Sequence, residues 1–290
     1  MSKKDTGQQY AYRVEPGTRV RLSDYDPRDA HGLKKQEGKA LLDQLDDELG
    51  ALQELLYAAD QHSVLLILQG MDTSGKDGTI KHVLKKVNPA GCRIVPFKQP
   101  TPQELAHDFL WRVHANTPAR GQFGVFNRSH YEDVVIVRVH ELVPEATWRS
   151  RYAQINAFEQ LLDAANTIII KCFLHISKDE QKERLLAREQ DVTKAWKLSA
   201  GDWVERRAWD NYTAAYEDAL SECSTAAAPW YIVPADRKWY RNLAIAHLLV
   251  NALRPHKEEW LAHLDALGKT ERELVLKARE EHSQHDDKHH

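Results

Sequence analysis

The sequence predicts an α/β fold in which a central parallel sheet carries helices on both of its faces. Short apolar runs that suit strands alternate along the chain with segments whose apolar residues recur at helical spacing, and this alternation is typical of parallel sheets. The run Val64–Leu68 is continuously apolar, which favours a strand buried on both faces. A glycine-rich turn follows it at once, at Gly70–Gly75, and a helical pattern begins after the turn.

The remaining elements follow in order along the chain. Leucines from Leu41 to Leu56 recur at helical spacing and predict an amphipathic helix that ends near Asp60. Further strands are expected at 93–97, 124–126, 168–176 and 230–233, and further helices at 76–86, 104–115 and 258–281. We expect an N-terminal arm and amphipathic helix over 1–60, a core over 61–255 with a lid at about 182–210, and a charged helix and tail over 256–290. The polar arm, residues 1–38, is expected to lie on the domain surface.

Composition argues against several classes of protein. The 290 residues carry a formal net charge of -3, which gives no overall case for a nucleic-acid partner. No apolar run approaches the ~20 residues that a membrane span needs, and the polar N-terminus lacks the apolar region of a signal peptide. The cysteines have neither zinc nor disulfide spacing, which predicts reduced thiols in a cytoplasmic protein: Cys92, Cys172 and Cys223.

The turn after the first buried strand matches a phosphate-binding loop. Glycines there let backbone N–H groups approach an anion, and the N-terminus of the next helix adds partial positive charge. Lys76 supplies a full charge to phosphate oxygens. The residues expected around the phosphates are Gly70, Met71, Thr73, Ser74, Gly75, Asp77, Gly78 and Thr79. A glycine-rich turn that binds nothing is the alternative interpretation.

One position departs from the usual loop pattern. Asp77 follows Lys76, where a P-loop NTPase carries the Ser or Thr that ligates magnesium. A metal must then be held by another residue, and Asp72 inside the loop is the candidate. A carboxylate that faces phosphates makes sense if a divalent cation lies between them. Alternatively, Asp72 points to solvent or caps a turn.

Two later loops carry candidate ligands for an acceptor phosphate and for metal. Lys98 follows the second strand, where small-molecule kinases of this type hold the acceptor phosphate, although the segment also reads as an ordinary loop. After the third strand comes Asn127, then Arg128, which could fork onto a phosphate. Glu132 and Asp133 could hold metal at the same sheet edge. Simple solvation of these charged groups is the alternative.

A basic segment precedes the last strand. Arg184 and Arg188 are four residues apart and share a helix face, and Lys197 and Arg207 follow. Such a segment could close over phosphates as a lid and exclude water. The alternative is a solvated helix with interleaved Glu and Lys pairs.

Several stretches together resemble the polyphosphate kinase 2 family. They are Leu68–Gly78, Phe126–Asp133, Trp196-Lys197, and Ala228–Trp230 with its continuation to Asp236–Lys238. The resemblance implies a P-loop kinase fold like that of thymidylate kinase, with a helical lid. It implies reversible, magnesium-dependent transfer of a terminal phosphate between polyphosphate and a nucleotide, with manganese as a second candidate metal.

The same resemblance implies roles for individual residues. Asp72 corresponds to the loop aspartate near metal and acceptor, Lys76 to the loop lysine, and Arg128 to the arginine after the third strand. Many members carry Asp where this chain has Asn127, which moves the anionic role toward Glu132 or Asp133. The acceptor nucleotide is expected at Lys98, Asn127 and Glu132. The polyphosphate track is expected at Lys81, Lys85, Arg184, Arg188, Lys197 and Arg207.

The resemblance also implies substrates and partners. The form of the Asn127–Asp133 stretch is most like the members that accept both mono- and diphosphates, with AMP, ADP and ATP as nucleotides and GMP or GDP as further candidates. A homo-oligomer is expected, because members of the family often assemble. Two rival functions remain: an ATP-dependent nucleoside monophosphate kinase, and a non-catalytic P-loop module that senses a nucleotide.

Overall fold

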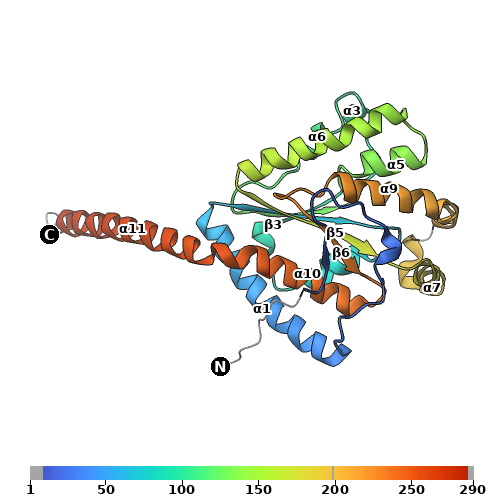
Figure 1. The fold of residues 1–290 in the computed structure, drawn as a ribbon. Coiled ribbons are helices and arrows are strands. Elements are labelled where there is room, and N and C mark those ends of the chain that lie inside the picture. Colours follow the sequence, from blue (N-terminus) through green and yellow to red (C-terminus); the bar gives the residue numbers. More distant parts are fainter. Residues whose placement is uncertain (1–8, 198, 287–290) are drawn as a thin grey trace.

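The computed structural model describes residues 9–197 and 199–286. Its centre is a six-stranded sheet in the order β1-β6-β5-β2-β4-β3 (Figure 1). The strands are β1 (Tyr12–Arg13), β2 (Ser63–Gln69), β3 (Cys92–Pro96), β4 (Phe123–Asn127), β5 (Thr167–His175) and β6 (Trp230–Pro234). All pairs from β3 to β6 are parallel, and only β1 joins antiparallel. The predicted α/β fold is confirmed.

The central strand positions the phosphate-binding loop. All seven residues of β2 are buried, as its continuous apolar run predicts. Its neighbours on either side are β4 and β5, and the chain leaves the adjacent strands β2 and β5 in opposite directions across the sheet, toward β3 and β6. Ligands of open α/β sheets bind at such a switch point, beyond the carboxyl ends of the strands. The chain leaves β2 at this edge and enters Gly70–Gly75.

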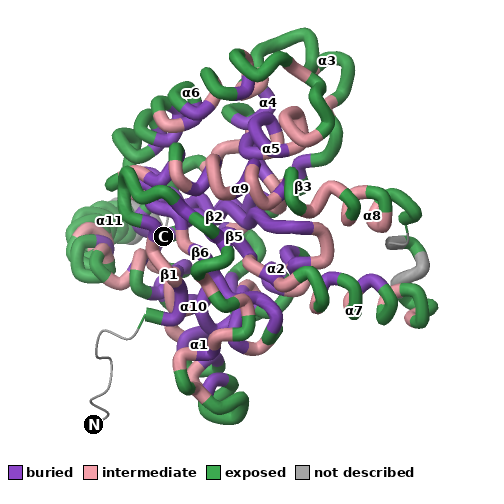
Figure 2. Tube along the Cα trace, turned by 45° about the vertical axis from the view of Figure 1, so that its right-hand side comes forward, coloured by how far each residue is buried: buried purple, intermediate pink, exposed green. Residues whose placement is uncertain are grey.

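Helices cover both faces of the sheet (Figure 1). On one face lie α1 (Lys35–Ala59) and α10 (Lys238–Leu253), which pack together, and on the other lie α5 (Glu132–Val139), α6 (Glu145–Ala164) and α9 (Trp209–Glu222). The other helices are α2 (Lys76–Val83), α3 (Pro102–Leu105), α4 (Trp111–His114), α7 (Lys178–Glu189), α8 (Ala200–Glu205) and α11 (Lys257–Asp286). Burial concentrates in the strands and in the helix faces that meet them (Figure 2). No described helix is long and apolar enough to cross a membrane.

The amphipathic helix follows its predicted pattern. Leu45, Leu49, Leu52 and Leu56 of α1 are buried, because their spacing places them on one helix face. The helix ends at Asp60, whose φ of 52° is left-handed, and this conformation commonly closes a helix. The predicted end near Asp60 is confirmed.

The N-terminal arm is more deeply embedded than a surface segment. Val14, Val20 and Leu22 are buried, and β1 adds an antiparallel edge to β6. The prediction that this arm lies on the surface is therefore wrong. A two-residue strand is too short to leave a periodic signal in the sequence, so its pairing could not be read from the chain.

The single helix expected over 104–115 is also wrong, because two short helices, α3 and α4, occupy the segment. The Asp108 carboxylate accepts a hydrogen bond from the Leu110 N–H at 2.9 Å. Aspartate side chains that bond to nearby backbone compete with helix continuation, and this turn separates α3 from α4.

A buried ionic network joins the sheet to the helices of one face. Lys171 of β5 donates to the Glu159 carboxylate of α6 at 2.5 Å, to the Tyr131 hydroxyl at 2.9 Å and to the Cys223 carbonyl at 2.6 Å. The Lys171 and Glu159 side chains are 0% and 1% exposed. The network therefore fixes the segment just before α5 against the core.

Replacing Lys171 by Met should destabilise the fold. Removing one partner of a buried ion pair leaves an uncompensated charge, here on Glu159, and typically costs about 3–5 kcal/mol. Urea unfolding measures the loss, with Lys182→Met, at an exposed position of α7, as the control. Adding Glu159→Gln to Lys171→Met should recover part of it. A loss below that of the control would show that the network contributes little to stability.

Candidate active site

The loop between β2 and α2 adopts a conformation that requires glycine at its ends. Gly70 has φ 148° and Gly75 has φ 101°, both in the region that side chains rarely adopt. A Cβ on Gly70 would lie 2.7 Å from the Leu174 carbonyl oxygen, and a Cβ on Gly75 would overlap the Arg241 guanidinium. Thr73 between them also has a left-handed φ, 62°. The close packing and the positive φ explain why both positions hold glycine and not a larger residue.

Lys76 lies over the loop and binds its carbonyl oxygens. Its Nζ donates to Gly70 O at 2.8 Å and to Met71 O at 3.3 Å, and lies 3.4 Å from Ser74 Oγ. Burial, followed by the charge of Arg128, lowers the pKa of Lys76 to about 8. A phosphate group beside the ammonium would reverse this effect, because a negative charge favours the protonated form.

Two arginines and a glutamine hold the loop from outside. Arg184 of α7 donates through Nη1 to Thr73 O at 2.9 Å and Ser74 O at 3.0 Å. Arg241 of α10 donates to the same Ser74 oxygen at 3.1 Å. Gln181 Nε2 donates to Asp72 O at 3.2 Å. Two guanidinium groups therefore lie behind the loop, and burial and the neighbouring Arg184 lower the pKa of Arg241.

Arg128 bridges two carboxylates in front of the loop. It follows β4 with a left-handed φ of 62°, and its guanidinium donates to Asp72 Oδ1 at 2.7 Å and to Glu132 Oε2 at 3.1 Å. Burial alone would lower the pKa of Arg128, but Glu132 and Asp72 together raise it above its ordinary value. The structure thus brings together three of the predicted site residues from two separate segments, the loop after β2 and the segment after β4.

Asn127 connects β4 to the start of α2. Its Nδ2 donates to Asp77 Oδ1 at 2.8 Å. Asp77, which replaces the usual Ser or Thr after the loop lysine, is therefore hydrogen-bonded to the last residue of β4. Asp77 and Asn127 together fix the spacing between the loop and the Arg128 segment.

A cleft lies between the loop and the helices α7 to α9. It is lined by Gly70, Met71, Asp72, Arg128, Glu132, Ile136, Gln181, Glu205, Arg206, Trp209, Tyr212 and Tyr216. A cavity of about 620 Å³ lies beside it and shares Met71 and Trp209. This volume falls within the range of small-molecule sites, roughly 300–1,000 Å³.

Comparison with known proteins identifies the family. The model of the family described as polyphosphate kinase 2 matches residues 32–260. This chain belongs to the polyphosphate kinase 2 family. The predicted family is confirmed, and with it the prediction that the chain is a phosphotransferase enzyme.

Curated relatives and a solved structure agree with this assignment. A Meiothermus ruber AMP/ADP-polyphosphate phosphotransferase is 51% identical over 244 residues, which is 83% of this chain and 91% of the relative. A Rhodopseudomonas palustris ADP-polyphosphate phosphotransferase is 46% identical over 85% of this chain and 90% of its own length. The crystal structure of polyphosphate kinase 2 from Arthrobacter aurescens superimposes with a TM-score of 0.81 at 47% identity, covering 84% of this chain and 87% of that one. The predicted P-loop kinase fold is confirmed.

Two predicted site residues of this polyphosphate kinase 2 family member lie elsewhere. Asp133, a predicted metal ligand, is buried between Arg112 at 3.3 Å and Arg151 at 3.7 Å and does not line the cleft. Lys85, a predicted track residue, pairs with Asp43 at 3.0 Å and Asp46 at 2.8 Å on α1. These pairs correct both assignments, because the charges are already neutralised by partners outside the cleft.

The predicted lid arginines also have internal partners. Besides the loop carbonyls, Arg184 contacts Glu180 and the carbonyls of Ala235 and Asp236, so it supports the loop, and its place on a polyphosphate track stays a prediction that these contacts do not favour. Arg188 donates to Asp202 of α8 at 2.7 Å. Lys81, Lys98 and Arg207 are exposed. The side chain of Lys197 lies outside the described residues. A lid remains a prediction.

Sequence reasoning missed the aromatic wall of the cleft. Trp209, Tyr212 and Tyr216 come from α9, and their spacing of three and four residues places them on one helix face. This spacing was a usable signal, but it is equally typical of an ordinary core face. Gln181, which also lines the cleft, was not predicted, because the interpretation of this segment rested on its Arg and Lys residues.

Replacing Lys76 by Ala should remove most activity and leave the protein folded. Among the described residues, the hydrogen bonds of the ammonium go to atoms of the loop, and groups that stabilise developing charge are typically worth about 10²–10³ in rate. Turnover with polyphosphate measures the effect, thermal unfolding verifies the fold, and Lys182→Ala is the matched exposed control. Near-normal turnover in the Lys76 variant would remove it from the site.

Proposed function

We propose that this enzyme transfers the terminal phosphate of inorganic polyphosphate to AMP and ADP, reversibly and by in-line displacement. The observation that carries the proposal is the position of Arg128, held between Asp72 and Glu132 in front of a phosphate-binding loop. The relatives named for AMP/ADP and ADP at 51% and 46% identity support the acceptors.

The chain's own residues account for most of what this reaction needs. An oxygen of the acceptor phosphate attacks the end phosphorus of polyphosphate, and the bond to the next bridging oxygen breaks. Such transfers need positioning and charge neutralisation more than covalent help. Lys76 and Arg128 supply positive charge to the transferring group, while Asn127 and Asp77 hold the loop and the Arg128 segment at a fixed separation.

A divalent metal fits the cleft. Polyphosphate kinases generally depend on one, and we propose magnesium, with manganese as a substitute that accepts the same oxygen ligands. Asp72 and Glu132 offer carboxylate oxygens to the same cleft from different segments, and both would hold the ion. The ion would neutralise phosphate charge, so the two carboxylates would not repel the substrates. Asp133 is not included, because two arginines enclose it.

Compartment and assembly are part of the proposal. The three cysteines form no disulfide, and Cys172 and Cys223 are buried, which supports a cytoplasmic protein. An oligomer is supported by apolar side chains on exposed edges, such as Ile94 on the edge strand β3, which is 49% exposed.

One assay tests the proposed function. Purified protein is incubated with magnesium and polyphosphate, free of ATP, together with AMP, ADP, GMP or GDP in turn, and the new nucleotides are separated by chromatography. We expect AMP to give ADP and ADP to give ATP. Activity with ATP as donor and none with polyphosphate would establish the monophosphate kinase alternative instead. No turnover with either donor would leave the nucleotide-sensing module.

Replacing Asp72 by Asn should lower the rate and raise the magnesium concentration needed for half-maximal rate. The change removes the negative charge while keeping the shape, so loss of a metal ligand is separated from loss of packing. Rates are measured over a magnesium series, with Asp43→Asn, an exposed carboxylate of α1, as control. An unchanged rate and magnesium dependence would exclude Asp72 from the metal site.

A further inference from the structure

A second group of possible metal ligands lies at the opposite edge of the sheet from the cleft. His62 immediately precedes β2, whereas the phosphate-binding loop follows it. His256 ends the short 3-10 helix Arg254–His256, and Glu259 lies in the first turn of α11. One donor atom from each of the three side chains lies within 4.8 Å of the others. None of the three takes part in the proposed phosphoryl transfer.

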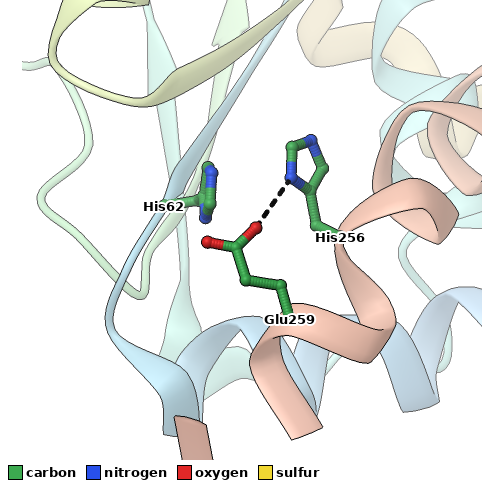
Figure 3. A group of neighbouring side chains, drawn as sticks. All are labelled: His62, His256 and Glu259. Carbon is green, nitrogen blue, oxygen red and sulfur yellow. Dashed lines mark ion pairs between the residues drawn. The ribbon is translucent and has the colours of Figure 1, made fainter. Parts of the chain in front are cut away.

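The side chains converge on one point. Figure 3 shows the Glu259 carboxylate between the two imidazole rings, with one oxygen toward each ring. The ion pair from His256 Nδ1 to Glu259 is 3.8 Å long, and the ring centroids of His62 and His256 are 4.4 Å apart. His256 and Glu259 are three residues apart and so share a helix face. The two histidines are half-buried, while the Glu259 side chain is 58% exposed, which leaves an entry path from solvent.

Trp260 contacts both imidazole rings and fixes their orientation. It is fully buried, its ring stacks on His256 with centroids 5.7 Å apart, and its indole N–H donates to His62 Nδ1 at 3.0 Å. Because indole is only a donor, His62 Nδ1 carries a lone pair and no proton. Burial, followed by the nearby His256, lowers the pKa of His62, and a neutral imidazole is the form that binds metals.

We propose that His62, His256 and Glu259 form a site for one divalent transition-metal ion of the zinc class. Two imidazole nitrogens and one carboxylate oxygen are ligands that zinc accepts, whereas magnesium prefers oxygen alone. Water would supply the fourth ligand on the exposed side of Glu259. The ion would tie the first turn of α11 to the loop between α1 and β2, far from the reacting phosphates.

The proposal makes Trp260 a reporter. The His62 ring that would bind the ion also accepts the indole N–H, so binding should change the surroundings of Trp260. A mere packing cluster around Trp260 would show no such response to metal. Trp260→Phe should abolish the change in tryptophan emission while one equivalent of metal still binds.

Zinc binding is measured on the full chain with His282, His285, His289 and His290 replaced by Gln, because the tail could itself bind zinc. Excess magnesium is present to occupy oxygen sites. We expect one equivalent of zinc by equilibrium dialysis and a rise in the unfolding temperature of about 5–10 °C at a hundredfold excess of zinc over its Kd. His256→Ala and Glu259→Gln should each weaken binding at least about tenfold, and His82→Ala, an exposed histidine of α2, should change nothing.

Three results would overturn the site. They are the absence of saturable zinc binding in the tail-substituted protein, binding that is equally strong in the His256 and Glu259 variants, or an unchanged emission of Trp260 on saturation. Basal activity with polyphosphate and the unfolding temperature without zinc verify that each variant is folded. Cobalt absorption in the visible region distinguishes a tetrahedral site from binding at scattered surface groups.

Discussion

The carbonyl groups of the phosphate-binding loop impose the constraint on which the rest of the site depends. A loop whose N–H groups are to face an anion must turn its carbonyl oxygens away, and buried carbonyls need donors. Here five successive carbonyls, from Gly70 to Ser74, accept from side chains: Lys76, Gln181, Arg184 and Arg241. These donors come from α2, α7 and α10, so the loop keeps its form only when helices distant in sequence are already packed.

The Arg128 segment depends on a second buried framework. Ser129, which follows Arg128, accepts from Gln69 Nε2 at 3.1 Å, and His130 lies 3.2 Å from Glu159. Tyr131 donates to the same carboxylate at 2.8 Å. Because Lys171 neutralises Glu159, three consecutive residues are anchored in the core, and this anchoring can maintain the left-handed backbone at Arg128. The Arg128 guanidinium is thus held on a rigid support while its side chain stays 37% exposed.

Much of the site could be predicted because it follows from topology. Asp72, Arg128 and Glu132 come after the adjacent parallel strands β2 and β4, and the carboxyl ends of such strands meet at one edge. What failed was the direction of individual side chains. Glu132 and Asp133 are neighbours in sequence but point about 100° apart around a helix, so one reaches the cleft and the other meets Arg112 and Arg151. The two arginines that enclose Asp133 lie on α4 and α6, and no local pattern in the sequence identifies them as its partners.

The basic segment shows why a run of cations is weak evidence for a polyanion track. Arg184 is occupied by five backbone and side-chain acceptors, and Arg188 is paired with Asp202. A phosphate chain that binds along α7 and α8 must displace such carboxylates, and each exchange of one anion for another gains less than the pairing of an unpaired cation. Under the proposed function, most of the attraction must then come from Lys76, whose ammonium contacts neutral loop carbonyls, and from the exposed Lys81 and Arg207. Such an arrangement holds the reacting end of polyphosphate more firmly than the remainder of the chain.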